Sequence, residues 1–206
     1  MQLLDNFSSG VLAFVVLKTL REEFQRTKES RDNIFISTLF VSSYNTVVLS
    51  LANLVKPNQD SVHLDYLFNC ITSSKKELGI EVYSQVSAFI PEFQSALEKV
   101  ADTINVTITL RDTSVAHLDR KHVNNPSSLL QNPPVTWDDM EMAYNIVGSG
   151  LSEIGKYLSL LDIHPYATIT NLVLAQETRR VFNLFYGSEN CSSKKLGYNL
   201  EDQHAG

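Results

Sequence analysis

The segment from Ile34 to Val55 constrains the fold more than any other part of the sequence. It contains no charged residue, and apolar side chains recur at helical spacing on most of its sides. A helix that is apolar nearly all round is stable in water only when neighbouring elements bury it. Asn33 can cap the start of this helix and Pro57 ends it. The sequence therefore predicts a helical bundle with this helix at its centre.

Amphipathic segments on either side supply the rest of the bundle. Helices are predicted over about 3–28, 64–71, 137–161 and 167–186. Asp60 or Ser61 is the expected cap of the second of these helices. Thr136 is the expected cap of the third, in which Asp139 favours the positive end of the helix dipole.

The prolines and asparagines of residues 124–134 mark the clearest loop of the chain. Apolar residues are spread evenly along the sequence, which gives no reason to divide it. We therefore expect one domain over residues 1–187, followed by a polar tail over residues 188–206.

The middle of the chain is less clear. Residues 78–86 favour no element, and Pro91 suits the first turn of a long helix that continues to Arg111. Asn105–Leu110 is β-branched enough for a strand, but its apolar residues keep helical spacing and a lone strand has nothing to pair with. The prediction is an all-α fold of about six helices with a long central helix.

Charge and cysteine usage exclude several classes of protein. The net charge of -6 argues against a broad phosphate-binding surface, so any RNA contact must be local and no DNA partner is expected. Cys70 and Cys191 lie in no metal-ligand spacing, and two free thiols suit a reducing cytoplasm. No metal or cofactor motif is present, and Gly148-Ser-Gly150 is typical of close helix packing.

The apolar run Val11–Leu17 is the only candidate for a targeting segment. No positive charge precedes it and no small-residue cleavage pattern follows, so we interpret it as part of an amphipathic helix. No stretch reaches the roughly 18 uncharged apolar residues of a membrane span. A soluble cytoplasmic protein without a membrane partner is expected.

The segment Leu110–His122 concentrates charge in a chain that is otherwise modestly charged. Its second residue is Arg111, the polar Asp112 comes next, and His117 follows after four more residues. This spacing resembles the pattern that defines HEPN domains, and the sequence Arg111–Arg120 resembles its version in AbiU-type abortive-infection proteins.

Two further blocks resemble the same branch in the same order. One is the buried segment 47–55 followed by Asp60-Ser61, and the other is 134–140, at the start of a helix. Together the matched blocks reach from about residue 40 to residue 160.

The resemblance implies an HEPN-like bundle and a metal-independent endoribonuclease. Its product would carry a 2′,3′-cyclic phosphate, and it would act in abortive infection or as the toxin of a toxin–antitoxin pair. Arg111 and His117 would be catalytic, Asp112 would orient one of them, and Arg120 and Lys121 would hold the RNA backbone. The partners implied are a second copy of the chain, RNA and an antitoxin protein; no cofactor is implied.

Histidine and arginine suit metal-independent RNA cleavage for reasons that do not depend on the resemblance. His117 can act as acid or base because the ordinary pKa of histidine lies near neutral pH. Arg111 offers a planar, permanently charged fork for a phosphate. Six residues turn an ideal helix through about 600°, so the two side chains would lie about 120° apart. A two-fold dimer, as in the family, would bring them together.

Other interpretations stay open. Arg111 and Asp112 can form a surface ion network, and His117 can cap a helix end. The whole chain can be an HEPN-fold dimer without nuclease activity that binds nucleotides, RNA or a regulatory partner. Trp137 can pack in the bundle or stack on a base, and Arg179 can be an ordinary solvated charge.

Overall fold

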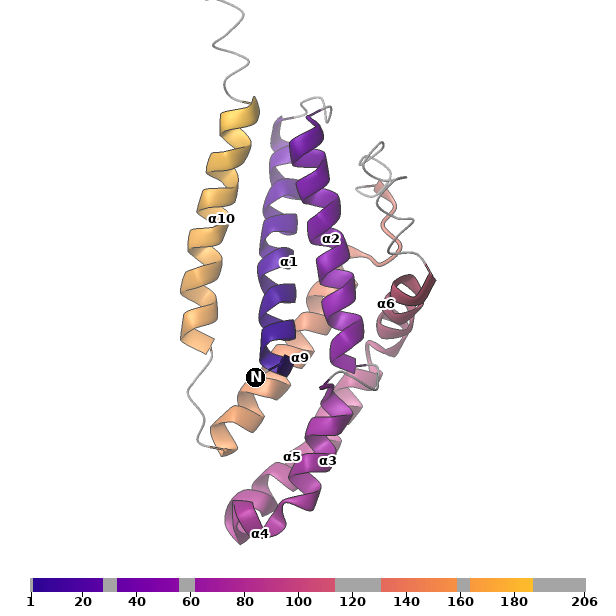
Figure 1. Cartoon of the computed structure of the whole chain (residues 1–206), viewed down its shortest axis with the longest axis vertical. Coiled ribbons are helices and arrows are strands. Elements are labelled where there is room, and N and C mark those ends of the chain that lie inside the picture. The colour runs from indigo at the N-terminus through magenta and orange to yellow at the C-terminus, as the bar shows by residue number, and fades with distance from the viewer. Residues whose placement is uncertain (1, 28–32, 56–61, 114–130, 159–163, 187–206) are drawn as a thin grey trace, which may run out of the picture.

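The computed structural model describes residues 2–27, 33–55, 62–113, 131–158 and 164–186. These ranges hold eight helices and no strand (Figure 1). The helices are α1 (Gln2–Thr27), α2 (Ile34–Val55), α3 (Leu64–Ser73), α4 (Lys75–Leu78), α5 (Ile80–Glu98), α6 (Ala101–Thr113), α9 (Trp137–Tyr157) and α10 (His164–Tyr186). The all-α prediction is confirmed, with eight helices in the described ranges instead of about six.

Helix α2 is the centre of the bundle, as its apolar sequence predicts. It packs along α1 on one side and along α6 on another, and α10 lies against the face of α1 away from α2 (Figure 1). Phe40, Tyr44 and Leu51 are among its fully buried side chains. The predicted cap is also confirmed, because Oδ1 of Asn33 accepts hydrogen bonds from the backbone N–H groups of the second and third helical residues, at 3.0 and 3.2 Å.

Two helices, α1 and α2, are long and apolar enough to span a membrane by length and composition. The sequence analysis expected no such segment. In α2, 61 % of the apolar window is buried inside the bundle, as in the core helix of a globular protein.

The structure corrects the predicted long helix. Helix α5 begins at Ile80, so Pro91 lies inside it and not in its first turn. Pro91 is exposed while Ile90 and Phe93 are buried, so packing keeps a helix that the proline ring would otherwise interrupt. The helix then ends at Glu98, where the backbone N–H of Val100 bonds to the carbonyl of Leu97 at 3.1 Å, and α6 starts afresh.

Three helix starts also differ from the prediction. His63 caps α3, accepting a hydrogen bond from the backbone N–H of Tyr66, whereas Asp60 and Ser61 lie outside the described residues. Gly79, with φ of 77°, separates α4 from α5. Helix α10 begins at His164, three residues before its predicted start at about residue 167.

Close packing around α9 confirms the interpretation of Gly148 and Gly150. A Cβ on Gly148 would lie 2.9 Å from the Phe7 ring, and one on Gly150 would overlap the Phe93 ring.

Trp137, the first residue of α9, is buried against Tyr44 and Phe40, which leaves its ring unavailable for stacking on a base. Thr136 caps the helix as predicted, accepting from the backbone N–H of Asp139.

Candidate functional site

Arg111 lies in the last turn of α6, which packs along α2. Ile104 and Thr107 of the same helix are buried. Residues three, four and seven apart share one face of a helix, so burying these two also turns Arg111 toward the bundle. The rotation of α6 about its axis therefore decides where the guanidinium points.

The guanidinium reaches across to α2. Nη1 of Arg111 donates a hydrogen bond to Oδ1 of Asn53 at 3.1 Å. Only 14 % of the Arg111 side chain is exposed. A charged group removed from most of the water needs such partners, because an unpaired charge is costly to bury. Asn53 therefore fixes one end of the Arg111 fork to the central helix.

Asp112 holds the other edge of the same fork. Nε and Nη2 of Arg111 each lie 3.0 Å from Oδ1 of Asp112, whose side chain is 42 % exposed. This is the edge of a guanidinium that binds a carboxylate or phosphate with two parallel bonds. An anionic ligand at this edge must therefore compete with the Asp112 carboxylate or displace it.

The structure brings together part of the predicted site. Arg111 and Asp112 are in contact, while His117, Arg120 and Lys121 lie outside the described residues. The sequence analysis did not predict that Asn53 is part of the site. Its only signal is an amide near the end of a very apolar helix, and nothing local links it to an arginine 58 positions later.

Within the described ranges, no group of three or more His, Cys, Asp or Glu side chains is arranged to hold a metal ion. Cys70 there is a free thiol, as expected, and Cys191 falls outside those ranges.

Comparison with known protein families identifies the fold. A family model described as AbiU2, of the HEPN type, matches residues 8–164. This span contains Asn53, Arg111 and Asp112 and covers more than half of the chain. The chain belongs to the AbiU2 family of HEPN proteins. No curated protein and no solved structure matches it. The resemblance seen in the sequence is thus confirmed for this AbiU2-family chain.

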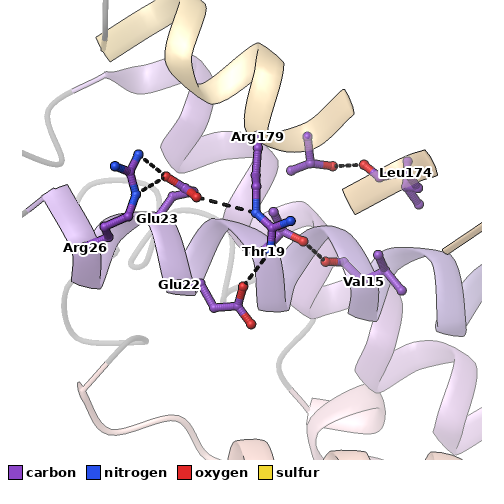
Figure 2. Close-up of polar contacts among 8 residues, drawn as sticks. Val15, Thr19, Glu22, Glu23, Arg26, Leu174 and Arg179 are labelled. Atoms are coloured by element: carbon purple, nitrogen blue, oxygen red, sulfur yellow. Dashed lines mark hydrogen bonds and ion pairs between the residues drawn. The ribbon is translucent and has the colours of Figure 1, made fainter. Parts of the chain in front are cut away.

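Almost all of α10 lies beyond the segment that matches AbiU2, and a polar cluster attaches it to α1 (Figure 2). Arg179 of α10 lies 2.9 Å from the Glu22 carboxylate and 3.5 Å from that of Glu23. Glu23 is 7 % exposed and also accepts from Nε of Arg26 at 2.9 Å. Arg179 therefore stays partly solvated, with 45 % of its side chain exposed, but it also pairs with α1, and the sequence does not show this pairing.

Proposed function

We propose that this protein is a metal-independent endoribonuclease that acts in abortive infection or as the toxin of a toxin–antitoxin pair. The observation that supports the proposal is the mostly buried Arg111, which lies within the segment that matches the AbiU2 family and is anchored from a second helix by Asn53. The proposed location is the cytoplasm, where RNA and an antitoxin protein would both be encountered.

The proposed reaction is an internal transfer at phosphorus. The 2′-oxygen attacks the phosphorus atom, and the bond from phosphorus to the 5′-oxygen breaks. One group takes the proton of the 2′-hydroxyl and another gives a proton to the leaving 5′-oxygen, so the products are a 2′,3′-cyclic phosphate and a 5′-hydroxyl. His117 would act as acid or base, and Arg111 would stabilise the charge that develops on the phosphate oxygens.

A homodimer would complete this site. An ideal helix separates Arg111 from His117 by about 120°, so one chain alone does not converge them. Two motif helices facing each other across a two-fold axis would line one cleft with two such pairs. In this arrangement Arg120 and Lys121 would contact the RNA backbone at the rim.

A second candidate is an HEPN-fold dimer without nuclease activity that binds nucleotides, RNA or a regulatory partner. The contact between Asp112 and the Nε–Nη2 edge of Arg111 favours it, because that edge is already neutralised. The net charge of -6 favours it as well.

Purified protein incubated with total RNA in EDTA separates these two candidates. We expect cleavage by the wild type, loss of cleavage in Arg111→Ala and in His117→Ala, and retention in Arg180→Ala. Arg180 is a matched control because it is an exposed arginine of α10. Mapping the ends of the fragments tests for the cyclic phosphate, and light scattering tests for the dimer. Equal background cleavage in all four proteins would rule out the nuclease.

A further inference from the structure

A groove runs between α5 and α9, apart from the Arg111 site. Its cavity volume is about 850 Å³. The residues of α9 that line it extend from Asp138 to Tyr157, nearly the whole helix. At 1.5 Å per residue this stretch is about 28 Å long, which equals about five turns of a partner helix.

The floor of this groove is apolar and partly open to solvent. Phe89 stacks on Phe93 with ring centroids 6.0 Å apart, and its ring also lies 6.0 Å from that of Tyr157. Gly150 lets the Phe93 ring approach the backbone of α9. The side chain of Met142 is 50 % exposed in the groove. A helix with an apolar stripe would cover these groups.

The rim of the groove is acidic. Glu92, Asp138, Glu141 and Glu153 line it, and none of the lining residues is Lys or Arg. Glu141 pairs with Lys18 at 2.8 Å and Glu153 with Lys156 at 2.9 Å. Glu92 and Asp138 form no ion pair with any other residue of the described segments. One carboxylate on each helix, Glu92 on α5 and Asp138 on α9, is therefore left without an ion-pair partner among the described residues.

We propose that this groove binds a basic amphipathic helix of a partner protein. Its length suits a helix, its floor suits an apolar stripe, and its rim suits lysine or arginine on either side of that stripe. The same rim repels the phosphates of RNA and of anionic lipid surfaces. This proposal does not rest on the ribonuclease activity, so either can fail without the other.

A designed peptide tests the groove on the full chain. The probe is a fluorescent 20-residue peptide of leucine and lysine, with leucine at helical spacing on one face. The control is a scrambled peptide of the same composition that has no apolar face. Fluorescence anisotropy should show binding at least about tenfold tighter for the patterned peptide, and this difference should persist as salt is raised.

Variants of the groove should remove this preference. We expect Met142→Glu to weaken binding of the patterned peptide about tenfold, because it places a carboxylate on the apolar floor. The double variant Glu92→Lys, Asp138→Lys should weaken it as much. The control variant Asp65→Lys, Glu81→Lys makes the same change in net charge at exposed positions outside the lining and should weaken binding less than threefold.

Three results would overturn the proposal. One is equal binding of the patterned and scrambled peptides, and another is equal weakening by the two double variants, since both indicate attraction to an acidic surface in general. The third is a wild-type dimer that Met142→Glu converts to monomer, which would assign the groove to a second copy of this chain. Circular dichroism confirms that each variant is folded before binding is compared.

Discussion

Nη1 of Arg111 and Oδ1 of Asn53 lie 3.1 Å apart, although 58 positions separate the two residues in the sequence. The contact joins the end of α6 to the end of α2, the most buried helix of the bundle. An arginine anchored in this way has its guanidinium oriented before any ligand arrives, which reduces the entropy lost on binding.

If the chain is the proposed ribonuclease, Asn53→Ala should lower kcat/KM for RNA cleavage about 10- to 100-fold, because a hydrogen bond to a charged group contributes about 1.5–3 kcal/mol. Asn53→Asp keeps an acceptor oxygen that can orient Arg111, so we expect its kcat to return to the wild-type value. Its added negative charge repels RNA, so we expect its KM to stay above that of the wild type. Cleavage kinetics measure both parameters. Asn69→Ala, an exposed amide of α3, is the control and should change neither. A role in stability alone would give no such split between kcat and KM.

Asp112→Asn should strengthen RNA binding about three- to tenfold, because it removes the carboxylate that occupies the Nε–Nη2 edge of Arg111. Filter binding with an RNA that lacks the attacking 2′-hydroxyl measures affinity without cleavage. Asp102→Asn makes the same charge change at an exposed position in the first turn of α6. If both variants strengthen binding equally, the effect is one of net charge and Asp112 does not compete with the phosphate.

Gly150→Ala and Gly155→Ala should act in opposite directions although both change a buried glycine of α9. A Cβ at Gly150 would overlap the Phe93 ring, so we expect a loss of about 1–3 kcal/mol in the free energy of unfolding. A Cβ at Gly155 has no neighbour within 4 Å, so higher helix propensity should add about 0.5–1 kcal/mol. Urea denaturation of both variants measures the difference. Equal changes would contradict the proposed packing of α5 on α9.

Stability should fall as pH rises above the ordinary tyrosine pKa. Burial raises the pKa of Tyr44 to about 12 and also raises that of Tyr144, whose hydroxyl donates to the carbonyl of Val47 at 2.8 Å. The folded state therefore keeps these protons while the unfolded chain releases them near pH 10, and stability is lost between about pH 10 and 12. Urea denaturation at a series of pH values measures this slope.

Tyr144→Phe should make the alkaline slope shallower while costing about 1 kcal/mol at pH 7, because the buried hydrogen bond is lost. Tyr83→Phe removes a phenol from a half-buried ring of α5 and serves as the control. A slope that Tyr144→Phe leaves unchanged would mean that this phenol does not couple to folding.

Glu23→Gln should weaken the packing of α10 on α1. Glu23 is buried between Arg26 and Arg179, and its loss as an anion should lower stability by about 1–2 kcal/mol, a modest value because both arginines are partly exposed (Figure 2). Hydrogen exchange should show faster opening of α10 than of α2. Glu22→Gln, at the exposed neighbour, should have less than half of this effect. Equal effects of the two variants would show that burial of Glu23 is unimportant.

Local patterns in the sequence determined most of the secondary structure. The apolar run of α2, its Asn33 cap and the Thr136 cap of α9 were all predicted correctly, because helix periodicity and capping depend on residues within about one turn of each other. The motif containing Arg111 also identified the family, since a family pattern is a property of the sequence itself.

Tertiary packing decided what the local pattern left open. No glycine or proline marks the end of α5 at Glu98, so the sequence did not predict it. Pro91 lies inside α5 because the residues around it are buried. The pairing of Arg111 with Asn53 depends on how α6 is rotated against α2, and that of Arg179 with Glu23 on which helix covers α1. Each of these contacts joins groups far apart in sequence, and only the packing of whole helices sets their distance.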